Sequence, residues 1–195
     1  MKKLILIVLI LQLYSCHKVK RSEAGTVYVS KDFEDLEINS GGWSTQVVVD
    51  TTNWRVVEFN SGNKCAYINN WNSVNSESES WLISPNIDLS NSVEPYLNFD
   101  NVSRFEGDML KLLISTNYDG QGNPNDFIWG DFSSYANWDL ISSTYESWTF
   151  SENIDLSIFS NSSIYIAFKY VGSSFDGKAW VIDNITVKEP EEFSN

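Results

Sequence analysis

Asp183 is the acidic residue whose position says most about its chemistry. It alternates with Val181, Ile185 and Val187 along an apolar run, so we expect its carboxylate to lie in the core or at its rim. A carboxylate in such a place needs a cation, such as Ca²⁺, or several hydrogen-bond donors. The alternatives are that a β-bulge turns Asp183 outward, or that its carboxylate accepts backbone N–H groups as a corner clamp.

Asp88 and Asp155 occupy matching positions in a sequence that the chain contains twice. The two copies are WLISPNIDLS at Trp81–Ser90 and WTFSENIDLS at Trp148–Ser157. Two acids that flank a bond could hydrolyse a glycoside, but identical local sequence favours two equivalent turns in which each carboxylate accepts backbone N–H groups. His17 is the only histidine, and the chain has no Ser/His or His-rich metal motif. We therefore predict that the protein is not an enzyme, with a small glycan-active enzyme as the least favoured alternative.

A third candidate site consists of aromatic residues in or beside polar loops. Exposed rings next to Asn and Asp suit sugar binding, because rings stack on pyranose faces while amides bind hydroxyls. The candidate ligand-binding residues are Trp71, Tyr118, Trp129, Tyr135 and Trp138. The alternative is that long loops, such as the segment Asn117–Ala136, fold back and bury their own rings. The tryptophans predicted to lie in the core are Trp54, Trp81, Trp148 and Trp180.

Residues 1–15 have the pattern of a bacterial leader. Lys2 and Lys3 precede an apolar run, Leu4–Leu13, that is too short to span a bilayer. The sequence Leu13-Tyr14-Ser15-Cys16 resembles the lipobox of bacterial lipoproteins, which predicts a signal peptide over 1–15 and lipidation of Cys16. An ordinary signal peptide is the alternative. Residues 16–25 then form a tether, and the membrane is contacted through the lipid alone.

The net charge argues against nucleic acid as a partner, and the number of cysteines argues against stabilisation by an internal disulfide. The formal net charge is −13 and the isoelectric point is about 4.3, so nucleic acid would be repelled and is not a predicted partner. Cys65 is the only cysteine besides Cys16, so lipidation of Cys16 leaves no pair for an internal disulfide. Cys65 lies in a strand-like run and is predicted to be a small buried hydrophobe.

Short strand-like runs must position all of these residues, because no stretch shows a convincing helical period. Each copy of the repeated sequence is followed, at the same distance, by an apolar run, a Phe-acid-Gly turn and a second apolar run. Two copies are too few for a solenoid and suit the two halves of a β-sandwich. We predict an all-β domain over residues 26–188 with two antiparallel sheets and pseudo-repeated halves, followed by an acidic tail at 189–195.

Several motifs together resemble a known group of domains. Asp32-Phe33-Glu34-Asp35, followed by Gly42-Trp43 and Trp54-Arg55, resembles the opening of MAM domains. Five further motifs resemble the choice-of-anchor J and cleaved-adhesin domains of exported Gram-negative proteins. They are Trp81–Pro85, Ile87–Ser90, Leu112–Tyr118, Ile166–Tyr170 and Ile182–Ile185. MAM domains carry disulfides that this chain lacks, so the bacterial branch is the better match. The resemblance covers roughly Phe33 to Val187.

The resemblance implies a jelly-roll β-sandwich, MAM- or concanavalin-like, that serves adhesion or the binding of carbohydrate or protein without catalysis. In that fold the first and last strands are neighbours, which would bring Glu34 or Asp35 close to Asp183, so these three acids are the predicted ligands of a structural Ca²⁺. The predicted partner is a polysaccharide or a cell-surface protein. The predicted location is the envelope of a Gram-negative bacterium, as an outer-membrane lipoprotein facing the periplasm or the surface. A structural accessory subunit of an envelope complex is the alternative function.

Overall fold

The computed structural model describes residues 25–59, 62–70, 77–140, 147–173 and 177–190. Sheet A contains, in spatial order, β10 (Thr149–Phe150), β7 (Tyr96–Arg104), β13 (Ala179–Lys188), β4 (Asn63–Ile68) and β3 (Arg55–Phe59), with β1 (Val27–Lys31) paired to β13 and β11 (Ile154–Asp155) paired to β7. Sheet B contains β2 (Ser44–Val49), β5 (Ser78–Ile83), β12 (Ser163–Gly172), β8 (Lys111–Ser115) and β9 (Gly130–Asp131), with β6 (Ile87–Asp88) paired to β12. The helices of the described residues are single 3-10 turns, η1 (Ser40–Gly42), η2 (Pro124–Asp126), η3 (Ser133–Tyr135) and η4 (Ser157–Phe159), and none of them could cross a membrane.

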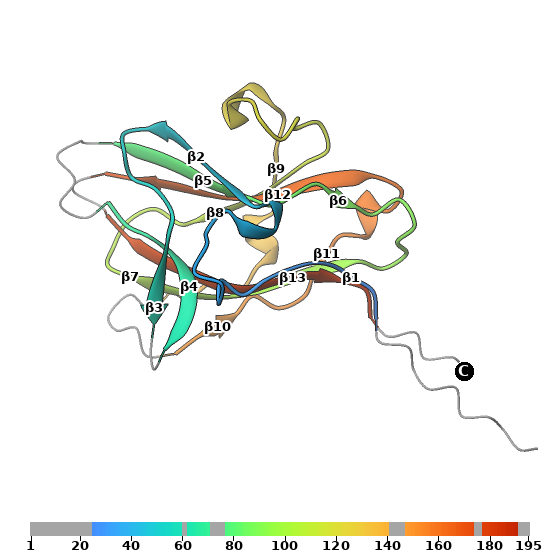
Figure 1. Cartoon of the computed structure of the whole chain (residues 1–195), viewed down its shortest axis with the longest axis horizontal. Helices are drawn as coiled ribbons and strands as arrows, with labels where there is room; N and C mark the ends of the chain where they lie inside the picture. Colours follow the sequence, from blue (N-terminus) through green and yellow to red (C-terminus); the bar gives the residue numbers. More distant parts are fainter. Residues whose placement is uncertain (1–24, 60–61, 71–76, 141–146, 174–176, 191–195) are drawn as a thin grey trace, which may run out of the picture.

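The two sheets pack face to face as a β-sandwich, with the main core between them (Figure 1). Every second residue of β12 faces this core, namely Ile164, Ile166, Phe168 and Tyr170, as the alternation of the sequence predicts. Each aliphatic side chain buried in this way contributes about 1.5–3 kcal/mol to folding. The predicted all-β sandwich of two antiparallel sheets is confirmed.

The repeated sequence occupies equivalent places in the two sheets. In the first copy, Ile87 and Asp88 form β6 and pair with the start of β12 in sheet B. In the second copy, Ile154 and Asp155 form β11 and pair with the start of β7 in sheet A. Each copy therefore pairs with the long strand that follows the other copy in the sequence, which ties the two halves of the domain together.

The long segment after β8 folds back over the outer face of sheet B, where Figure 1 shows it in yellow and olive. Tyr118 and the partly buried Trp129 pack there against Trp81, Ile83 and other apolar residues of the sheet. The ring centroids of Trp81 and Trp129 are 5.3 Å apart. The outer face of sheet B is therefore covered by this segment around Trp81.

A β-bulge divides β13 into two parts, and the residues that face the main core have even numbers before it and odd numbers after it. Asp183 is paired with Asp100 and Thr186 with Asn98, so two residues, one of them Asn184 at φ 51°, lie opposite a single residue of β7. Before the bulge Trp180 and Ile182 face the main core, and after it Ile185 and Val187 do. The expectation that Val181, Asp183, Ile185 and Val187 share one face is therefore wrong, because the extra residue of the bulge reverses the alternation.

The sandwich has two distinct ends along its strands. At one end, which we call the terminal end, Val27 of β1 is paired with Lys188 of β13. At the other, the far end, Ala179 of β13 is paired with Arg104 of β7. The ten residues of β13, from Ala179 to Lys188, separate the two ends by about 30 Å, at about 3.3 Å for each of the nine steps.

Candidate ligand-binding site

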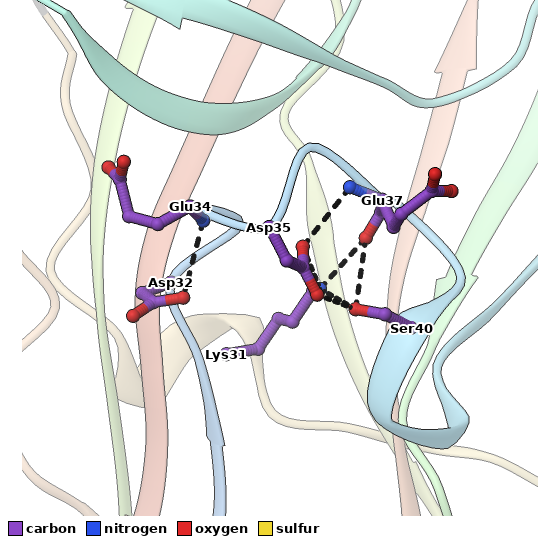
Figure 2. Close-up of polar contacts among 6 residues, drawn as sticks. All are labelled: Lys31, Asp32, Glu34, Asp35, Glu37 and Ser40. Carbon is purple, nitrogen blue, oxygen red and sulfur yellow. Dashed lines mark hydrogen bonds and ion pairs between the residues drawn. The ribbon is translucent and has the colours of Figure 1, made fainter.

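Asp35 forms an ion pair within its own segment rather than with the last strand. The ammonium of Lys31 lies 3.1 Å and 3.2 Å from the two carboxylate oxygens of Asp35 and donates to the carbonyl of Glu37 at 2.8 Å. Ser40 donates its hydroxyl to Asp35 and also accepts from Lys31. Figure 2 shows these groups converging, while Asp32 and Glu34 point away from them. The Ser40 hydroxyl, the Glu37 N–H and Lys31 lower the pKa of Asp35 from 3.8 to about 2.

Asp183 is 1% exposed and lies on the outer side of sheet A, opposite Asp100. Asn63 donates its amide to one carboxylate oxygen at 2.7 Å, and the backbone N–H of Asn184 donates to the other at 2.7 Å. Burial, together with the charges of Asp100 and Asp32, raises the pKa of Asp183 to about 6, although the two hydrogen bonds oppose this shift. The backbone clamp that we considered from the sequence is present, and the bulge leaves the carboxylate buried.

The structure does not bring the three predicted calcium ligands together. Glu34 and Asp183 both act on the buried thiol of Cys65, whose pKa burial and their charges raise to about 12. Asp35 is held on the other side of its segment by Lys31. Within the described ranges, no three His, Cys, Asp or Glu side chains are grouped so that they could hold a metal ion. The calcium ion itself stays a prediction. Asp32, rather than Asp35, is the acid of this segment whose charge acts on Asp183.

The aromatic residues predicted to bind a ligand differ in how exposed their rings are. Trp71 lies outside the described residues. Tyr118 is 5% exposed and offers no ring face to a ligand. Trp129 and Trp138 are partly buried, and each donates its indole N–H to a nearby backbone carbonyl, of Pro124 and Ser133 respectively. Only Tyr135, among the candidates that the structure describes, is largely exposed, at 66%. The prediction is therefore wrong for the buried Tyr118, and Tyr135 is the described candidate whose ring is most open to a ligand. For Trp71, Trp129 and Trp138 a ligand contact stays a prediction.

A pocket of about 450 Å³ lies near the far end of the sandwich. Lys111 opens β8 and Val171 stands near the end of β12, both on the outer side of sheet B because their neighbours Leu112 and Tyr170 face the main core. Pockets of this size commonly take small molecules or single sugar residues. The lining residues are Asp108, Met109, Leu110, Lys111, Asp131, Ser133 and Val171.

The polar groups of the pocket are only loosely paired. The Lys111 ammonium and the Asp131 carboxylate form a long ion pair of 3.9 Å, and neither group is saturated with hydrogen bonds by this contact. The Ser133 N–H donates to Asp131 at 3.0 Å, and the Ser133 hydroxyl accepts from the Leu112 N–H. Burial raises the pKa of Asp131, but the contacts with Ser133 and Lys111 prevail and lower it below its ordinary value. Asp131 is therefore ionised at neutral pH and acts as a hydrogen-bond acceptor.

The two repeated acids have the structural role that their sequence predicts. Asp88 accepts the backbone N–H of Ser90 at 2.9 Å, and Asp155 accepts that of Ser157 at 2.8 Å. In each case the serine lowers the pKa of the aspartate, which stays ionised. The two equivalent turns are confirmed.

Sequence reasoning did not find the pocket, because its lining comes from three segments that only the fold brings together. Asp108–Lys111 and Asp131–Ser133 flank the folded-back segment, and Val171 comes from the second half of the domain. The available signal was the position of Lys111, which breaks an apolar run at an outward-facing place.

Residues 86–193, more than half of the chain, match the family model described as a domain of unknown function (DUF5017). The chain belongs to this family. No curated protein matches it in sequence. Membership of the DUF5017 family therefore assigns no activity to the chain.

Solved structures with the same fold include adhesin and carbohydrate-binding domains. The K1 cleaved adhesin domain of Lys-gingipain from Porphyromonas gingivalis W83 is 18% identical, with a TM-score of 0.56 over 85% of this chain and 99% of that one. The K2 cleaved adhesin domain of the same protein is 16% identical, with a TM-score of 0.55 over 83% and 99%. TmCBM61, solved in complex with β-1,4-galactotriose, is 14% identical, with a TM-score of 0.50 over 86% and 99%. At these identities the likeness shows a shared β-sandwich fold.

Proposed function

We propose that this domain is a non-catalytic module that binds polysaccharide through the pocket at its far end. The observation that carries the proposal is the combination of apolar and polar groups on the pocket wall. Met109 and Val171 can contact the C–H face of a sugar ring, while Lys111, Asp131 and Ser133 can exchange hydrogen bonds with its hydroxyls.

Tyr135 is an exposed aromatic residue on the segment that supplies Ser133 to the pocket. It closes η3, two residues after Ser133, and its ring packs against Phe132 with centroids 5.4 Å apart. A ring held in this way by a neighbour loses little freedom when a ligand stacks on it. The structural likeness to adhesin domains and to TmCBM61 supports a binding role.

A catalytic role has less support from the acids of the site. A general acid needs a carboxyl whose pKa is raised, whereas the contacts around Asp131 lower its pKa. Asp183 has a raised pKa, but it lies on the outer side of sheet A. The pocket, on sheet B, therefore offers acceptors and donors for binding rather than a proton donor.

A glycan array tests the proposal, using the wild-type chain and the double variant Lys111→Met/Asp131→Asn. The matched control is Lys64→Met/Glu58→Gln, which removes an exposed ion pair of 2.6 Å on sheet A. We expect saturable binding that the pocket variant loses by about tenfold or more and the control retains. Absence of binding to every glycan contradicts the proposal and favours an accessory subunit. Release of shorter products would instead show an enzyme.

We also propose that lipid on Cys16 holds the domain on the outer membrane of a Gram-negative cell. The support is the lipobox-like sequence that ends at Cys16, nine residues before the first described residue, Gly25. Metabolic labelling with a palmitate analogue should mark the wild type and leave Cys16→Ser unlabelled. Cell fractionation, and access of an antibody to intact cells, then decide between periplasmic and surface display. Labelling that persists in Cys16→Ser contradicts the assignment.

A further inference from the structure

Two lysines of the domain are equally buried but differ in their partners. Lys31 and Lys178 are each 6% exposed. The ammonium of Lys31 is surrounded by oxygen atoms, from Asp35, Glu37 and Ser40. Among the described residues, the ammonium of Lys178 contacts only the sulfur of Met109, at 3.8 Å, and the ring of Trp180, at 5.0 Å.

Burying the ammonium of Lys178 with these two contacts costs folding free energy. A buried ammonium normally has oxygen acceptors, and a thioether is a weak substitute for them. Burial lowers the pKa of Lys178, and the charges of Glu106 and Asp139 offset this only in part. A buried cation without a close acceptor, next to a cavity, is a typical property of ligand-binding sites.

The ammonium lies directly behind the wall of the pocket. Met109, whose sulfur it contacts, is itself a lining residue and is partly exposed. The adjacent lining residue, Asp108, accepts the indole N–H of Trp180 through its carbonyl at 3.3 Å. Methionine is unbranched and adopts several rotamers at low cost, so the Met109 side chain can move aside while the backbone around it stays fixed.

The charges around the pocket select the kind of oxygen that can reach Lys178. Asp108 and Asp131 line the pocket, and the Lys111 charge is already shared with Asp131. The whole chain carries a net charge of −13, so a polyanion is repelled at long range as well. A neutral hydroxyl meets neither penalty and can accept a hydrogen bond from the ammonium.

We propose that Lys178 is a ligand-contacting residue of the pocket: an uncharged saccharide ring displaces the Met109 side chain and accepts a hydrogen bond from the Lys178 ammonium through a ring hydroxyl. This inference rests on the proposed function and narrows it to neutral glycans. It also gives a role to a buried cation that has no oxygen partner among the described residues.

Lys178→Met tests the contact, and Lys188→Met is its matched control. Lys188 also lies over an aromatic ring, Tyr96 at 5.7 Å, but at the terminal end of the sandwich. By titration calorimetry with the best neutral glycan of the array, we expect Lys178→Met to weaken binding by about 10- to 100-fold and Lys188→Met to leave it unchanged. Unchanged affinity in Lys178→Met overturns the inference. If the pocket double variant still loses binding in that case, the proposed function stands.

A second measurement tests the selectivity. The array carries uronate-containing glycans beside their carboxyl-reduced forms, which differ only in the charged group. We expect the reduced form of each pair to bind more tightly. Tighter binding of the uronate forms overturns the neutral-glycan inference while leaving polysaccharide binding intact, and absence of all binding overturns both.

Discussion

The ammonium of Lys31 lies 3.1 Å from the carboxylate of Asp35, and this pair fixes the chain between β1 and η1. A side chain of the protein thus supplies the cation for Asp35. The network is complete, because the remaining donors of Lys31 reach Glu37 and Ser40. Lys178, equally buried, has no such network among the described residues.

This contrast predicts that replacing each lysine with methionine changes the stability of the domain differently. Lys31→Met should lower the free energy of unfolding by about 1–3 kcal/mol, because Asp35, Glu37 and Ser40 lose their common donor. Lys178→Met should change it by less than about 0.5 kcal/mol or raise it, because no oxygen atom of the described residues loses a partner. Urea unfolding of both variants measures the difference. A loss of similar size in the two variants would contradict our account of Lys178.

The buried Asp183 predicts a pH dependence with a definite sign. Its pKa is raised from 3.8 to about 6, so the folded state favours the protonated acid. The resulting stabilisation is full below pH 3.8 and is lost as the pH rises through 6. Asp183→Asn should therefore be about 1–3 kcal/mol more stable than the wild type at pH 8, with the gap closing towards pH 4. Urea unfolding at several pH values measures it, and a constant gap would show that the charge is not the cause.

Calcium binding at this place is tested by thermal unfolding. The calcium prediction made from the sequence requires that millimolar Ca²⁺ raise the unfolding midpoint, because a cation near Asp183 would offset its repulsion from Asp100 and Asp32. The rise should vanish in Asp183→Asn and persist in Asp35→Asn, since Lys31 already neutralises Asp35. Mg²⁺ serves as the control ion. No shift with Ca²⁺ would leave Asp183 as a backbone clamp alone.

The two equivalent turns should contribute equally to stability. Asp88→Ala and Asp155→Ala each remove one acceptor of a backbone N–H, so each should lower the free energy of unfolding by a small and similar amount. The turns lie on different sheets, so the double variant should show the sum. Chemical unfolding at neutral pH gives all three values. Strong non-additivity would mean that the two halves communicate through these corners.

Substitutions at Tyr135 and Trp129 should distinguish an effect on glycan binding from an effect on stability. Tyr135→Ala should weaken glycan binding and change stability by less than about 0.5 kcal/mol, because the ring is exposed. Trp129→Ala should cost about 2–4 kcal/mol, because its ring packs against Trp81 and Tyr118. Parallel unfolding and glycan titrations check both. A stability loss in Tyr135→Ala would show that its ring supports the fold instead.

Local patterns of the sequence were sufficient for the sheets and for the turns. The alternation in β12 and the repeated NIDLS string depend on neighbours close in the chain, and both predictions are confirmed. The prediction that Asp183 shares a face with Ile185 and Val187 was wrong, because one additional residue at Asn184 reverses the alternation. A bulge of this kind leaves no reliable mark in the sequence. The pocket was missed because Val171 and Asp131 approach each other only through the tertiary fold.

The pairing of Val27 with Lys188 also has a mechanical consequence. A pull on the N-terminus, resisted by a ligand held near Lys111, runs along β1 instead of across it. The β1–β13 hydrogen bonds are then loaded together, in shear, and must break at once, whereas a pull across the strand would open them one by one. The arrangement would therefore suit the lipid-tethered module that we propose, which has to hold its ligand under flow.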